Sequence, residues 1–100
     1  MSLQVSKSSD NRRVTMTIGK RFDFSLHREF RDAYSKEHED VEYIINMGNT
    51  EYMDSSALGM LLVLREHTSE QPGKIKLTGC QPTIRQILDI SNFTKLFVVE

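Results

Sequence analysis

The sequence is poor in cysteine and has no long apolar stretches. Its single cysteine, Cys80, has no partner for an internal disulfide, which fits a reducing compartment. The N-terminal stretch 1–7 lacks the apolar core of a signal peptide, and no apolar run approaches the roughly 20 residues that span a membrane. We therefore expect a cytoplasmic protein without a membrane partner.

The chain also lacks an excess of charge of one sign and the spacings of common metal and phosphate sites. Its formal net charge is -1, and Lys, Arg, Asp and Glu are mixed along the chain, so no clustered basic face for nucleic acid is expected. The histidines His27, His38 and His67 lie far apart, without a cysteine pair, and no Gly-Lys-Ser/Thr phosphate loop is present. We predict no nucleic-acid partner, no metal and no cofactor.

The sequence does contain an alternation of strand and helix patterns, over a length that suits one domain, 1–100. Period-two alternation or β-branched composition predicts strands at 3–7, 14–18, 41–47 and 74–78. Helical spacing of apolar residues predicts helices at 25–34, about 55–70 and 82–91, with Ser25 capping the first. Asn92 is a predicted left-handed stop. The core is then completed by Phe93, Leu96, Phe97 and Val98, the last in a loop or a short strand.

This order predicts an α/β fold with a mixed sheet of four to five strands covered by helices. The first two strands flank the turn-forming residues 8–11 and are expected to pair as an antiparallel hairpin. Strand 41–47 is mostly apolar, which is typical of a central strand covered on both faces.

The chain is organised around Asp54, Ser55 and Ser56, which stand directly before the apolar run 57–64. Asp and Ser cap helix starts because their oxygens accept the unpaired N–H groups of the first turn. The run is apolar on most sides, so we expect a buried helix, with Gly59 allowing a neighbour to pack closely. The serines are explained by capping alone, or they accept a phosphate, which a helix N-terminus stabilises through its dipole and free N–H groups.

The stretch Met-Asp-Ser-Ser-Ala-Leu-Gly at 53–59 resembles the phosphorylation motif of STAS-domain anti-sigma factor antagonists, Asp-Ser-Ser-Gly-Leu-Gly, with Ala57 in place of the first glycine. The resemblance spans nearly the whole chain and implies the STAS fold. It implies that Ser55, directly after the aspartate, is phosphorylated, with Ser56 as the alternative acceptor or a cap. It also implies a place for Asp54 in kinase recognition.

A second stretch, Gly19 to Phe24, matches the family's Gly-x-x-x-Asp loop beside the phosphorylation site. In the family this aspartate contributes to the kinase interface, which implies the same role for Asp23. The alternative is a solvated or helix-capping aspartate. Phe22 and Phe24 flank it, and we expect one of them in the core and the other, Phe24, at the partner surface.

The resemblance implies a bacterial partner-switching phosphoprotein without catalytic activity, acting as a monomer. It would bind a serine kinase that is also an anti-sigma factor, be released on phosphorylation, and be reset by a PP2C-type phosphatase. The output would be sigma-factor control or a related one such as biofilm or motility. The alternative is a STAS-like binding module with unphosphorylated serines in a signalling or lipid-transport complex. A hydrolase using Ser55 is disfavoured because no Ser-His-Asp arrangement is visible.

Overall fold

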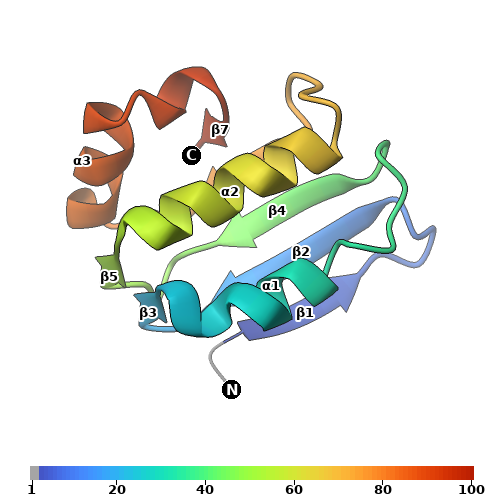
Figure 1. Cartoon of the computed structure of the whole chain (residues 1–100), viewed down its shortest axis with the longest axis horizontal. Coiled ribbons are helices and arrows are strands. Elements are labelled where there is room, and N and C mark those ends of the chain that lie inside the picture. The colour runs from blue at the N-terminus through green and yellow to red at the C-terminus, as the bar shows by residue number, and fades with distance from the viewer. Residues whose placement is uncertain (1–2) are drawn as a thin grey trace.

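The computed structural model describes residues 3–100 as a mixed sheet with helices packed on one face (Figure 1). The five-stranded sheet has, in spatial order, β1 (Leu3–Lys7), β2 (Arg13–Ile18), β4 (Glu42–Asn46), β6 (Ile75–Thr78) and β7 (Val98–Val99). β1 is antiparallel to β2, and each later neighbour is parallel. The predicted hairpin and mixed sheet are confirmed.

The helices within residues 3–100 are η1 (Phe24–Leu26), α1 (His27–Asp32), α2 (Ser55–His67), α3 (Pro82–Ile90) and η2 (Phe93–Lys95). The first pair replaces the single helix predicted at 25–34, and the N-cap of η1 is Asp23, not Ser25. Pro82 starts α3, and Asn92 has a φ of 62°, the left-handed stop that was predicted. No helix in this part of the chain has the length and apolar character needed to cross a membrane.

A second, two-stranded sheet forms where the sequence predicted no strand. β3 (Arg21–Phe22) pairs in parallel with β5 (Tyr52–Met53), with Arg21 opposite Tyr52 and Phe22 opposite Met53. Two residues are too few to show a period-two pattern, so no local signal indicates these strands. Phe22 and Met53 are buried, which anchors the small sheet to the core.

The core lies between the sheet and the helices. Side chains on the helix-facing side of the sheet, such as Met16, Ile45 and Leu77, are fully buried in one cluster with Leu61 and Leu64 of α2. Each aliphatic side chain removed from water in this way contributes about 1.5–3 kcal/mol. Four methionines are buried in the same core, namely Met16, Met47, Met53 and Met60.

Among residues 3–100 no helix covers the opposite face of the sheet, so the prediction that strand 41–47 is covered on both faces is wrong. Tyr43 and Ile45 are buried, whereas Ile44 and Asn46, which point to the other face, are half-buried. After β2 the strand order moves across the sheet in one direction, and right-handed crossovers then place the helices on the same side. The apolar composition of β4 reflects its central position in the sheet rather than a second layer.

α2 is buried on only part of its surface, which corrects the prediction of a buried helix. Ala57, Leu61 and Leu64 have no exposed surface, while Leu62 and Val63 are 38% and 52% exposed. Apolar side chains surround the helix, but only the sides that face the sheet and α1 have neighbours to pack against. Part of the apolar surface of α2 is therefore free.

The C-terminal segment closes the core with its two phenylalanines. The rings of Phe93 and Phe97 are stacked, with centroids 5.4 Å apart, and both are buried. Leu96 and Val98 are 38% and 36% exposed, so the prediction that they complete the core is wrong. Val98 pairs with Lys76 in the register of β6 and β7, which turns it to the uncovered face of the sheet.

Candidate functional site

β3 and β5 end side by side, and each is followed directly by an aspartate. Phe22 lies opposite Met53 in the parallel register, so Asp23 and Asp54 emerge from the same edge of the small sheet. The structure thus brings the predicted loop around Asp23 next to the start of α2. Residues about thirty positions apart in the sequence form one surface.

Asp54 is the N-cap of α2. Its Oδ1 atom accepts hydrogen bonds from the backbone N–H groups of Ser56 at 3.1 Å and Ala57 at 3.2 Å, and the Ser56 hydroxyl donates to it at 2.5 Å. The bond from the Ser56 hydroxyl holds the pKa of Asp54 below its usual range, against the opposing effects of desolvation and the negative charge of Asp23. Asp54 is therefore ionised at neutral pH and fixes the start of the helix.

Asp23 repeats this arrangement at the start of η1. Its Oδ1 atom accepts from the Ser25 backbone N–H at 3.0 Å and from the Ser25 hydroxyl at 2.5 Å, and the hydroxyl bond is the main cause that lowers the pKa of Asp23. Its Oδ2 atom lies 3.2 Å from Nε of Arg21. The Arg21 guanidinium also sits 4.2 Å from the centre of the Tyr52 ring and so bridges β3 and β5.

Sequence reasoning missed Arg21 and Tyr52 as parts of this surface. The spacing of two residues between Arg21 and Asp23 within an extended segment was the only local signal, because side chains two apart in a strand share a face. The contact with Tyr52 depends on the register of β3 and β5, which no local pattern shows.

The two serines of α2 have different environments. Ser55, the first residue of the helix, is exposed, and among the described residues its hydroxyl has no hydrogen-bond partner. Ser56 is half-buried, and its hydroxyl is oriented by Asp54. A partner therefore reaches Ser55 without displacing anything, while the hydroxyl of Ser56 already points at a carboxylate.

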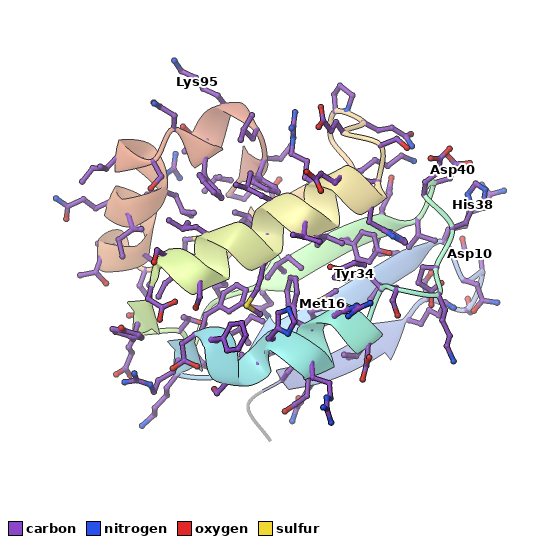
Figure 2. The ribbon with its side chains drawn as sticks, in the orientation of Figure 1. Asp10, Met16, Tyr34, His38, Asp40 and Lys95 are labelled. Atoms are coloured by element: carbon purple, nitrogen blue, oxygen red, sulfur yellow. The ribbon has the colours of Figure 1, made fainter. Side chains whose placement is uncertain are left out.

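An apolar groove of about 520 Å³ runs between α1 and α2 and begins at Ser56. Phe24 lies at its edge, is 65% exposed and stacks on His27 with ring centroids 4.8 Å apart. Tyr34 also lines the groove and lies between α1 and α2 (Figure 2). Phe22, by contrast, has no exposed surface, so of the two phenylalanines that flank Asp23 one is in the core and the other is at the surface, as predicted.

A family model described as the STAS domain matches residues 3–100. The chain belongs to the STAS domain family. A STAS-domain containing protein of Pseudomonas aeruginosa (strain UCBPP-PA14) is 43% identical over 100 residues, which cover 99% of each chain.

Solved structures share the fold of this STAS domain. The anti-sigma factor antagonist SpoIIAA in its unphosphorylated form matches with a TM-score of 0.75 and 19% identity, over 98% of this chain and 86% of that one. A putative anti-sigma factor antagonist of Thermotoga maritima gives 0.79 and 15%, over 97% and 84%. A sulfate transporter family protein of Wolinella succinogenes gives 0.71 and 16%, over 85% and 74%. At these identities the likeness shows the fold alone, and the predicted STAS fold is confirmed.

A larger hollow of about 700 Å³ lies at the other end of this STAS domain, near the labelled residues Asp10, His38 and Asp40 (Figure 2). Its exposed polar residues are partly paired with one another. The Ser8 hydroxyl donates to Asp10 at 2.6 Å, and Nδ1 of His38 lies 3.4 Å from a carboxylate oxygen of Asp40. This hollow shares no lining residue with the groove that begins at Ser56.

The remaining reactive side chains form no second site in residues 3–100. Within this range no group of His, Cys, Asp and Glu is placed to hold a metal ion. Cys80 is half-buried, and desolvation raises the pKa of its thiol. His27 and His38 are exposed.

Proposed function

We propose that this STAS domain is an anti-sigma factor antagonist that a serine kinase inactivates by phosphorylating the start of α2. The domain is a substrate and a monomeric binding partner, not an enzyme. The kinase is also the anti-sigma factor, a PP2C-type phosphatase removes the phosphate, and the cycle runs in the cytoplasm. The observation that carries the proposal is the pair of hydroxyls at the start of α2, directly beside an exposed apolar groove.

The acceptor is one of these two hydroxyls. Phosphoryl transfer forms a bond between the serine Oγ and the γ-phosphorus of ATP, breaks the bond to ADP and removes the hydroxyl proton. The proton of Ser56 already points at the ionised carboxylate of Asp54, whereas nothing among the described residues orients the hydroxyl of Ser55. We therefore favour Ser56, which reverses the order that the resemblance implied, and keep Ser55 as the alternative.

Phosphorylation would change the charge of this surface sharply. A phosphoserine carries about -1.5 to -2 charges at neutral pH, and it would stand beside the carboxylates of Asp54 and Asp23. A kinase bound over this surface would then face a desolvated cluster of negative charge. The released kinase would hold its sigma factor, or a partner in a related output such as motility or biofilm control.

A second function is favoured by one observation, namely that Ser56 and Asp54 together already form a complete helix cap. In this alternative the serines are never modified, and the domain is a constitutive binding module in a signalling or lipid-transport complex. Both functions use the same surface. They differ in whether phosphate is found on the domain.

The two functions are separated by incubating the purified domain with ATP and an extract of its own cells. Intact-mass and peptide mass spectrometry should find one phosphate at the start of α2 on the wild type. Ser56→Ala should abolish it, while Ser9→Ala, at an exposed serine in the first hairpin, should leave it unchanged. Phosphate retained on Ser55 in the Ser56→Ala variant would make Ser55 the acceptor, as the family resemblance implied. Phosphate on neither serine would leave only the binding module.

A further inference from the structure

Gly59 is a helical glycine that the fold of this domain does not need. It is exposed on α2, and within residues 3–100 a Cβ atom built on it would meet nothing within 4 Å beyond its chain neighbours and the adjoining backbone of its own helix. Gly79 shows the contrast, because its φ is +69° and a Cβ there would come within 3.0 Å of the Gly48 backbone. Glycine is a poor helix former, so its place in α2 has no internal explanation. The expectation that Gly59 allows a neighbour within the chain to pack closely is wrong.

Gly59 lies in the groove between α1 and α2, one turn after Ser56. Gly59 and Met60 lie three and four residues after Ser56, and Val63 lies four and three residues after them, so the four residues share one side of the helix. The missing side chain leaves bare backbone in the middle of this side. Apolar side chains that face solvent border it, because Val63 is 52% exposed and Phe24 on the opposite wall is 65% exposed.

The charges around the groove are of one sign. Among the described residues that line it, Arg31 is the permanent cation, His27 and Tyr34 are the other ionisable side chains, and none is a carboxylate. Arg31 belongs to no ion pair within residues 3–100. Arg31 also lines a neighbouring hollow together with Glu66 of α2. Glu66 does not line the groove itself. The groove therefore presents an apolar channel with an unpaired cation at its edge.

We propose that the groove is the docking site for a helix of the serine kinase, which seats an apolar side chain on the bare backbone of Gly59 and pairs a carboxylate with Arg31. This proposal rests on the proposed function and names the contact by which the kinase holds its substrate. The groove begins at Ser56, so the docked helix places the kinase directly over the acceptor. A phosphate on Ser56 puts a dianion at the mouth of the groove and repels that same carboxylate-bearing helix.

The test fills the groove without touching the acceptor or its cap. The initial rate of phosphorylation is measured in an extract of the domain's own cells that lacks the endogenous domain, over a range of domain concentrations. Gly59→Leu should slow the reaction at least tenfold at low concentration, and Gly59→Ala should slow it less. The plateau rate at high concentration should be retained, because Ser56 and Asp54 are unchanged. Gln86→Leu, which adds the same side chain to exposed α3, should react like the wild type.

Reversing the charge of Arg31 gives an independent test of the same contact. Arg31→Glu should slow phosphorylation several-fold at low concentration, while Arg28→Glu, on the same helix but outside the groove, should have less than a twofold effect. Melting temperatures of the Gly59 variants should equal or exceed that of the wild type, since a better helix former replaces glycine. If Gly59→Leu lowers the melting temperature, the phosphorylation rates of Gly59→Ala and Arg31→Glu decide whether the groove is the docking site.

The outcomes separate the two proposals. Wild-type rates for Gly59→Leu and Arg31→Glu, on a domain that is phosphorylated, would overturn the docking groove and leave the proposed function in place. A wild type that receives no phosphate would overturn the proposed function and the groove with it. A loss confined to low concentrations in both groove variants would establish the docking contact.

Discussion

The hydroxyl of Ser56 donates a hydrogen bond of 2.5 Å to Oδ1 of Asp54, and Ser25 makes the same bond to Asp23 in the neighbouring segment. Two helical segments therefore start with the same cap, side by side, at the edge of the small parallel sheet. The pairing of β3 with β5 is what turns two local caps into one surface. Arg21 contacts both Asp23 and the Tyr52 ring and so links the two segments.

The caps make stability sensitive to acid. The folded-state pKa values of Asp23 and Asp54 are lowered, mainly by the hydroxyls of Ser25 and Ser56, so the folded protein binds these protons less readily than the unfolded chain. The stabilisation is fully present above the unfolded value of about 3.9 and is lost as the pH falls through the lower folded values. We expect the urea midpoint to start falling below about pH 5 and to keep falling as the pH drops past the unfolded value.

Asparagine variants identify the groups responsible for that drop. Asp23→Asn combined with Asp54→Asn keeps a capping oxygen at each position but removes the titrating carboxylate. The midpoint of the double variant, followed by circular dichroism, should fall less with acid than that of the wild type. Equal acid sensitivity would assign the effect to other carboxylates, such as Asp10, whose pKa is also lowered, mainly by the Ser8 hydroxyl.

Phe22 and Phe24 form a matched pair for separating folding from binding. Phe22 has no exposed surface, so Phe22→Ala should lower the free energy of unfolding by about 3–5 kcal/mol. Phe24 is 65% exposed, so Phe24→Ala should change it by less than about 0.5 kcal/mol, yet slow phosphorylation by the kinase. Chemical denaturation and the extract assay give the two readouts. Unchanged phosphorylation of Phe24→Ala would remove Phe24 from the partner surface.

Phosphorylation should switch binding without unfolding the domain. A helix N-terminus stabilises an exposed negative group by only about 0.3–1 kcal/mol, so Ser56→Asp and Ser55→Asp should move the melting temperature by only a few degrees and leave the far-UV circular dichroism unchanged. A loss of about 2.8 kcal/mol of binding would weaken the affinity for the kinase about a hundredfold. Titration calorimetry with the purified kinase checks this, with Ser9→Asp as the control. Tighter binding by the phosphorylated domain would contradict release by charge.

Local patterns in the sequence predicted the elements that depend on local physics. Period-two alternation located β2 and β6, helical spacing located α2 and α3, and the residue types of Asp54, Pro82 and Asn92 marked helix ends. Caps and stops are decided within a few residues, because the groups they satisfy belong to the adjacent turn. The position of the serines at the start of α2 was therefore readable from the chain alone.

The tertiary structure decided which of these residues meet and which stay uncovered. The adjacency of Asp23 and Asp54 depends on two strands of two residues each, too short to leave a periodic signal, that pair across about thirty positions. The open face of β4, the free side of α2 and the empty space above Gly59 depend on where the crossovers place the helices. Apolar composition indicates that a side chain prefers burial. Only packing between distant segments determines whether a neighbour is there to bury it.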